Sequence, residues 1–166
     1  SKTAGEAYLM QSGLSVVSLR LSNICGPRLA IGPIPTFYKR LKAGQNCFCS
    51  DTTRDFLDIS DFFSLMDRVL QPDAPTGVFN VSTGEGRSIH DVFIAVANYL
   101  GIDPPDVPVV AQGADDVPKV VLDPSATQAT FNWCSHVGFE DTIANQLRWY
   151  DKHGITDIFS HLVAPS

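Results

Sequence analysis

One apolar run of strand length stands out early in the pattern of hydrophobic and polar positions. It is residues 16–28, V-V-S-L-R-L-S-N-I-C-G-P-R, in which Ser18 and Arg20 interrupt the apolar residues and Asn, Gly and Pro close the run. This pattern predicts a parallel strand that delivers a polar loop at its carboxyl end. Ligands bind at that end of open α/β sheets. An ordinary buried strand followed by a turn is the competing interpretation.

Along the rest of the chain, segments whose apolar residues have helical spacing alternate with segments that are typical of short strands. Residues 33–43 are predicted to form an amphipathic helix. Ser60 is the expected N-cap of a helix over residues 61–71, whose apolar side chains cover most of its circumference and predict burial on two sides. Ser88, with Asp91 three residues later, predicts the start of a long helix. Strands are expected at residues 47–49, 55–59, 78–81, 107–110 and 119–122.

Composition limits the possible partners. The 166 residues are 44% hydrophobic and 18% charged, which is ample for one α/β domain or for part of a larger one. The net charge of -6 and the absence of a Lys/Arg cluster argue against a nucleic acid or an acidic membrane as partner. We therefore expect single, placed cations to hold any anionic ligand.

Other patterns are weak. The sequence contains no apolar run of spanning length and its first residues are polar, so we expect neither a membrane helix nor a signal peptide, and a cytoplasmic protein. The four cysteines form no C-x-x-C pair and the histidines show no ligand spacing, so structural thiols and no metal site are expected. The glycines of T-G-E-G-R match neither phosphate-loop motif, which favours a plain strand-to-helix turn. Residues 1–13 resemble the inside of a helix without a start signal, so we expect a chain cut from something longer.

Four segments carry a family resemblance: S-K-T-A-G-E, L-R-L-S-N-I-C-G-P-R, T-R-D-F-L-D-I-S-D and F-N-V-S-T-G-E-G-R-S-I. In this order and spacing they resemble the C-terminal half of extended short-chain dehydrogenases/reductases, in particular the nucleotide-sugar epimerases and dehydratases. The resemblance implies the C-terminal end of a Rossmann-type doubly wound sheet interleaved with a small α/β substrate-binding domain. Residues 1–31 would end the dinucleotide-binding domain and residues 32–166 would form mainly the substrate-binding domain, with residues of about 60–100 packing back on the sheet.

The resemblance also implies site residues for the cofactor. Lys2 matches the lysine of a Tyr-x-x-x-Lys pair, whose Tyr would precede the first residue, and a nearby ammonium lowers a phenol pKa toward the working pH. Lys2 would also hold the ribose of the nicotinamide. The segment Leu21, Ser22, Asn23 and Ile24 would pass beneath the nicotinamide of NAD, and Asn23 would also touch the sugar or the diphosphate. A solvated lysine and a turn-forming asparagine are the alternatives.

On the substrate side, Arg54 matches the arginine that holds the diphosphate, and a structural ion pair with Asp55 is the alternative. Phe48 would stack on uracil or another base, unless it is a core aromatic of a short strand. Asp115 or Asp116 would match the ribose-binding aspartate, although the arginine that usually precedes it is missing. Where relatives often carry Tyr, this chain has Cys25.

The implied function is the substrate-binding part of an NAD-dependent nucleoside-diphosphate-sugar 4-epimerase, which oxidises sugar C4 transiently and belongs to O-antigen or polysaccharide synthesis. A UDP-sugar is the expected substrate. A 4,6-dehydratase and a non-catalytic nucleotide-sugar-binding module are the alternatives. Relatives pair the first helix across a two-fold axis, so a homodimer is expected, and Ala4 and Ala7 are small enough for close approach.

Overall fold

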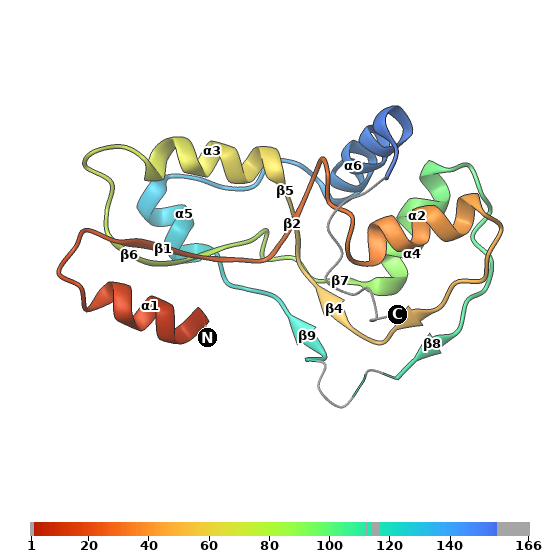
Figure 1. The fold of residues 1–166 in the computed structure, drawn as a ribbon, viewed down its shortest axis with the longest axis horizontal. Coiled ribbons are helices and arrows are strands. Elements are labelled where there is room, and N and C mark those ends of the chain that lie inside the picture. The colour runs from red at the N-terminus through yellow and green to blue at the C-terminus, as the bar shows by residue number, and fades with distance from the viewer. Residues whose placement is uncertain (1, 112, 114–116, 156–166) are drawn as a thin grey trace, which may run out of the picture.

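The computed structural model describes residues 2–111, 113 and 117–155. Helices alternate with short strands along the chain (Figure 1). The helices are α1 Lys2–Met10, α2 Pro33–Lys42, α3 Ile59–Val69, α4 Ile89–Tyr99, α5 Ser125–Phe131 and α6 Phe139–His153. The strands are β1 Val17–Leu21, β2 Asn23–Cys25, β3 Cys49–Ser50, β4 Thr53–Arg54, β5 Phe56–Asp58, β6 Gly77–Val81, β7 Arg87–Ser88, β8 Val109–Val110 and β9 Lys119–Val120.

Parallel pairing dominates the strands. β1 pairs with β6, β2 with β5 and β3 with β8, all in parallel. β4 lies between β9, which is parallel to it, and β7, which is antiparallel. The apolar run at residues 16–28 therefore supplies two consecutive strands, β1 and β2, with Ser22 between them. The predicted α/β class with a parallel sheet is confirmed.

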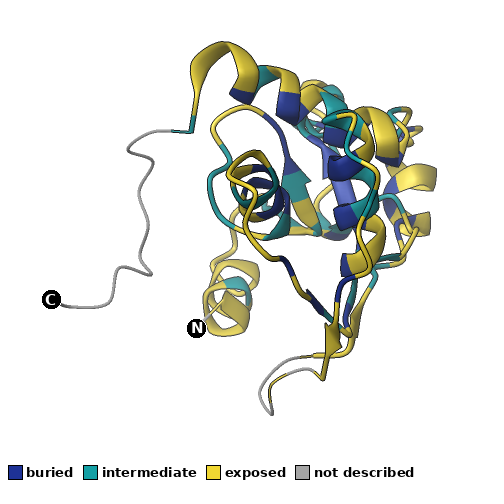
Figure 2. Ribbon diagram, turned by 90° about the vertical axis from the view of Figure 1, so that its right-hand side faces the viewer, coloured by how far each residue is buried: buried dark blue, intermediate teal, exposed yellow. Residues whose placement is uncertain are grey.

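Apolar side chains collect in two separate cores. The larger one lies among α2, α4 and α6 and includes Phe37, Phe93 and Tyr150, with the Phe37 and Phe93 rings edge to face at 5.4 Å between centroids. The smaller one lies beside the β1–β6 pair and includes Leu65, Phe79 and Trp133. Burial is highest where α2, α4 and α6 meet, whereas α1 contains no buried residue (Figure 2).

Of the two helix caps predicted at Ser60 and Ser88, one is confirmed. Ser88 caps α4 as predicted, because its hydroxyl accepts from Asp91 N at 3.0 Å while the Asp91 carboxylate accepts from Ser88 N at 2.8 Å. The expected Ser60 cap of α3 is wrong. Asp58 caps that helix instead, since its Oδ1 accepts from Ser60 N at 2.8 Å. The same carboxylate accepts from Asn145 Nδ2 on α6 at 3.0 Å, a contact that only the tertiary fold supplies.

The expected burial of α3 on two sides is also wrong. Leu65 on one side of the helix is fully buried, but Phe63 and Leu70 are 58% and 72% exposed. α3 therefore covers the β1–β6 side with one face and presents a partly apolar outer face. Among the described residues, no helix is long and apolar enough to span a bilayer.

Candidate functional site

Asp55 is the junction at which three of the motif segments meet. This carboxylate is fully buried and accepts from Thr83 N at 3.1 Å, Thr83 Oγ1 at 2.9 Å and Gly84 N at 2.8 Å. Gly84 has φ 81°, which a side chain would strain. The backbone oxygen of Asp55 accepts from both Asn23 N at 3.1 Å and Asn23 Nδ2 at 2.9 Å. The loops after β1 and β6 are thereby fixed to the segment that carries Arg54.

Asn23 is placed by this junction rather than by a turn of its own. It is the first residue of β2 and pairs in register with Phe56 on β5. Its side-chain nitrogen is engaged with Asp55, and its side chain lines a hollow of about 200 Å³. The side-chain oxygen accepts no hydrogen bond within the described part of the chain. That oxygen is the part of Asn23 that a ligand can use.

Arg54 is not the partner of Asp55. Its Nη1 donates to two backbone oxygens, Thr53 O at 2.9 Å and Pro118 O at 3.4 Å, while the Asp55 carboxylate is taken by Thr83 and Gly84. In the ranges that the structure describes, no carboxylate lies within ion-pair distance of this guanidinium. The expected alternative, an Arg54–Asp55 ion pair, is therefore wrong. The positive charge is held in place by carbonyl groups and is not neutralised by them.

Phe48 is exposed rather than a core aromatic. It precedes β3, is 52% exposed and lies under the Arg40 guanidinium, 5.7 Å from the ring centroid. It borders a mainly apolar hollow of about 390 Å³, whose walls are Ile31, Gly32, Pro33, Thr36, Phe37, Arg40, Phe48, Ser50 and Ile89. A half-exposed ring beside a hollow of this size can stack on a planar ligand.

The hollows at Phe48 and at Asn23 lie next to each other. They share the walls Ile31, Gly32 and Pro33. We call this combined space the Asn23–Phe48 cleft. Phe56 also lines it at the Asn23 end. Arg54 lies two residues before Phe56 in an extended segment, and alternate residues of such a segment leave the same face.

A third, larger hollow lies between α1 and the end of β1. It measures about 680 Å³, and Lys2, Glu6, Leu21 and Leu122 are among its walls. Glu6 fixes the helix to the strand, since its carboxylate accepts from Ser18 Oγ at 2.9 Å and from two Arg20 nitrogens at 3.1 and 2.6 Å. The Arg20 hydrogen bonds lower the pKa of Glu6, with Ser18 adding to the shift.

Two of the expected cofactor residues, Lys2 and Leu21, line this hollow. Lys2 is exposed and Leu21 is 45% exposed, both facing the same space. Ser22, between β1 and β2, carries a buried hydroxyl that has no hydrogen-bond partner in the described chain. A buried polar atom without a partner is costly, and a ligand amide or hydroxyl would satisfy it. These residues fit the nicotinamide end of NAD. Ile24 follows on β2 and lines the Asn23 hollow.

The remaining predicted residues differ in outcome. Asp115 and Asp116 lie outside the described residues. Cys25 is buried in the larger core, and burial raises the pKa of its thiol to about 12, with Asp58 and Asp55 contributing. It is therefore a neutral packing group. Cys47 and Cys49 are buried and Cys134 is exposed.

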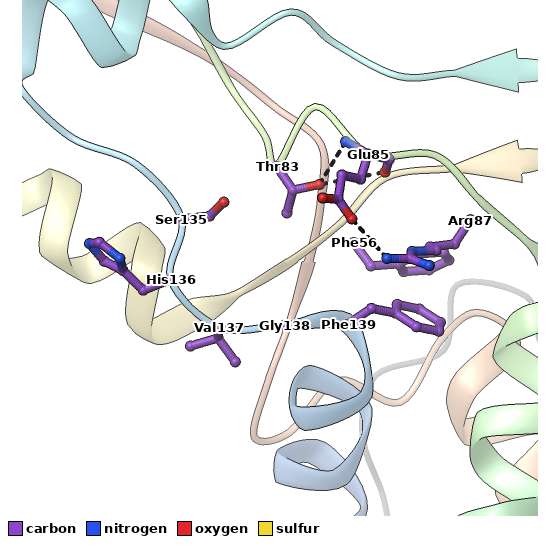
Figure 3. Close-up of a pocket in the computed structure, with 9 residues that line it drawn as sticks. All are labelled: Phe56, Thr83, Glu85, Arg87, Ser135, His136, Val137, Gly138 and Phe139. Carbon is purple, nitrogen blue, oxygen red and sulfur yellow. Dashed lines mark hydrogen bonds and ion pairs between the residues drawn. The ribbon is translucent and has the colours of Figure 1, made fainter.

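Sequence reasoning missed a polar cavity beside the cleft. It measures about 210 Å³, and Arg87 lies across it with its guanidinium 5.1 Å from the Phe139 ring centroid (Figure 3). The walls are Phe56, Thr83, Glu85, Arg87, Ser135, His136, Val137, Gly138 and Phe139. Phe56 therefore borders both this cavity and the Asn23–Phe48 cleft. The segment T-G-E-G-R contains Arg87 and was noted in the sequence. Its position beside this cavity follows only from the pairing of β7 with β4.

Comparison with known proteins defines the family. Residues 1–82 match the model of the NAD dependent epimerase/dehydratase family, and the chain belongs to this family of extended short-chain dehydrogenases/reductases. The crystal structure of the Bordetella bronchiseptica enzyme WbmG in complex with NAD and UDP is similar over 99% of this chain and 53% of that one, with 68% identity and a TM-score of 0.91.

Two further known proteins are similar to this chain. The B. bronchiseptica enzyme WbmH in complex with NAD⁺ is 32% identical over 92% of this chain and 51% of its own, with a TM-score of 0.84. UDP-arabinose 4-epimerase 1 of Arabidopsis thaliana is 25% identical over 173 residues, which are 88% of this chain and 41% of that protein. The chain thus spans about half of the solved relatives and about two fifths of this plant epimerase.

Proposed function

We propose that this chain is the substrate-binding part of an NAD-dependent UDP-sugar 4-epimerase. The observation that carries the proposal is Arg54, which has no carboxylate partner among the described residues and lies two positions before Phe56, a wall of the Asn23–Phe48 cleft. A cleft with an exposed aromatic at one end, a cation along it and an amide oxygen at the other suits a base, a diphosphate and a sugar in that order. A relative crystallised with NAD and UDP supports the choice of nucleotide.

In this proposal the residues around the hollow between α1 and β1 would hold NAD. Lys2 would hold the nicotinamide ribose, and Leu21, Ser22, Asn23 and Ile24 would lie along the nicotinamide. When bound, the cofactor accepts a hydride from the sugar and returns it. The Ser22 hydroxyl would then gain the hydrogen bond that it lacks within the protein. Lys2 would lower the pKa of a tyrosine phenol four residues earlier on the same helix, which would exchange the proton of the sugar hydroxyl.

Two other functions remain as alternatives. The family includes dehydratases, which begin with the same oxidation, and the cleft described above suits both reactions. A non-catalytic binding module would keep Arg54 and Phe48 but would have no use for Lys2. Turnover measurements on a Lys2 variant therefore distinguish the module from the enzymes. Product analysis by NMR distinguishes the two enzymes, because a dehydratase releases a 4-keto-6-deoxy sugar. A homodimer and a cytoplasmic location are parts of the same proposal.

The test is substrate affinity in the full-length protein that carries this chain. Arg54→Gln should weaken UDP binding by about a hundredfold, because a charge-assisted contact in a partly desolvated cleft is lost. Arg54→Lys should cost about tenfold, since an ammonium keeps the charge without the paired donors. Calorimetric titration with UDP in the presence of NAD measures both.

Arg148→Gln is the matched control. Arg148 is exposed on α6 and hydrogen-bonds within its own helix, so this variant removes the same charge away from the cleft. It should keep wild-type UDP affinity. Unchanged affinity in both Arg54 variants would show that the arginine serves the fold and that the proposed diphosphate site is misplaced.

A further inference from the structure

We infer that Arg87 is a second cation for the diphosphate, facing Arg54 across the β4–β7 pair; this rests on the proposed function. The first step is the strand register. Arg54 and Arg87 are directly opposite each other in the antiparallel pair, and directly opposed side chains leave the same face of a sheet. Two like charges in this position are destabilising unless an anion lies between or beside them. A ligand with two negative charges supplies that anion.

The hydrogen bonding of Arg87 leaves donors for a ligand. Its Nη2 donates to Glu85 Oε2 at 2.8 Å, but the Glu85 side chain is 68% exposed, and such ion pairs contribute little. Its Nε is buried and has no hydrogen-bond acceptor in the part of the chain that the structure describes. The guanidinium lies over the Phe139 ring, with its Cζ 5.1 Å from the ring centroid (Figure 3). Its Nη1 donates no hydrogen bond to the described residues, and a charged donor of this kind is suited to a phosphate oxygen.

The position of Arg87 relative to the cleft follows from Phe56. Phe56 borders both the Arg87 cavity and the Asn23 hollow, and it pairs in register with Asn23. The cavity holds about 210 Å³ and is lined by hydroxyl groups and an imidazole as well as by Arg87. The cavity therefore adjoins the Asn23 end of the cleft, with the Phe56 side chain as their common wall.

Other cations are less suitable partners for Arg54. Lys119 is opposite Thr53 in the parallel pair, so its side chain leaves the other face of the sheet. Arg40 donates to Asn46 O at 2.9 Å and lies over Phe48, at the end of the cleft assigned to the base. In a chain with a net charge of -6, a diphosphate needs more than the one charge of Arg54, and Arg87 supplies the second.

The experiment compares UDP with uridine, which lacks the diphosphate, in the full-length NAD-loaded protein. Arg87→Gln should weaken UDP binding by about tenfold and leave uridine binding within twofold, because only the phosphate contact is removed. Arg148→Gln should change neither. Equal UDP affinity in wild type and Arg87→Gln overturns the inference, and so does an equal loss for UDP and uridine, which would indicate a role in packing against Phe139.

A second measurement on the unmodified protein applies if Arg87→Gln does not fold. Phenylglyoxal labelling followed by peptide mass spectrometry should show that UDP protects Arg54 and Arg87 but not Arg148. Protection of Arg54 without Arg87 overturns this inference and leaves the proposed function standing. Absence of UDP binding by the wild-type protein, with neither arginine protected, would instead refute the proposed function.

Discussion

Two regions of this molecule differ in how many apolar side chains they bury. The region of α2, α4 and α6 encloses its own apolar core, and α4 alone buries Ile89, Val92, Phe93, Val96 and Ala97. The region of α1 and β1 buries almost nothing: Tyr8 and Leu14 are 80% and 71% exposed, and Glu6 joins the helix to the strand through surface hydrogen bonds. The first region buries most of the apolar side chains and borders the Asn23–Phe48 cleft, the proposed substrate site. The second exposes Lys2 and several apolar side chains, which can function only in contact with a ligand or with another part of the protein.

The largest effect should come from the enclosed core. Phe93→Ala should lower the free energy of unfolding by about 3–5 kcal/mol, because a fully buried ring in edge contact with Phe37 leaves a cavity. Urea unfolding monitored by circular dichroism measures this. Phe63→Ala on the outer face of α3 is the control and should stay within about 0.5 kcal/mol. Similar losses in both would show that the two environments are not as different as the burial indicates.

The second prediction concerns the open region, where function and stability should separate. Lys2→Met should reduce epimerisation in the full-length protein by about a hundredfold or more, since the phenol that it assists loses its nearby ammonium. Its unfolding free energy should not change, because Lys2 is exposed. Product NMR measures turnover, and Lys152→Met, in the exposed last turn of α6, is the matched control. Normal turnover in Lys2→Met would favour the binding module.

The third prediction tests the junction between the regions. Asp55→Asn should cost about 2 kcal/mol of stability, because an amide oxygen replaces a buried carboxylate that accepts from Thr83 and Gly84. UDP affinity should fall as well, since Arg54 is the adjacent residue. Asp51→Asn removes an exposed charge from the same segment and should change neither. Loss of stability with full UDP affinity would show that the junction does not position Arg54.

The smallest effect on stability is expected when the Glu6 contacts that attach α1 to β1 are removed. The pKa of Glu6 is lowered by Arg20 and Ser18, so its contribution to stability is present above its ordinary pKa and is lost as the pH falls through the lowered folded value. Wild type should therefore exceed Glu6→Gln in stability at neutral pH, and the difference should shrink below about pH 4. Thermal melts across this range check the sign. A difference that grew in acid would contradict it.

Local signals predicted much of the fold. The apolar spacing predicted the helix over residues 33–43, which the structure has as Pro33–Lys42, and the Ser88 and Asp91 spacing predicted the capping box of α4. The α3 start was missed because two polar residues compete for it within three positions. Asp58 prevails over Ser60 partly because Asn145, far along the chain, donates to the same carboxylate. A contact between residues so far apart in the chain cannot be predicted from a short sequence segment.

The sequence predicted which residue types form the proposed site, but not the groups that each of them contacts. The sequence identifies Arg54 from its motif and Phe48 from its place before that motif. The structure removes the local alternative for each, since Asp55 has other donors and Phe48 is exposed. Arg87 was missed because strand register, not spacing, brings it opposite Arg54. Long-range pairing of short strands depends on the whole fold, so a one-dimensional pattern carries little information about it.

The Asp55 junction has a consequence for how movement is distributed in the proposed epimerase. One peptide unit and its carboxylate tie together the segment beneath the nicotinamide, the loop after β6 and the arginine beside the diphosphate. We expect these linked parts to form one frame, in which the distance from Arg54 to the segment around Asn23 is set before substrate arrives. A ketose that must turn its other face to the cofactor then has to swing about its own glycosyl and phosphate torsions while the frame stays still.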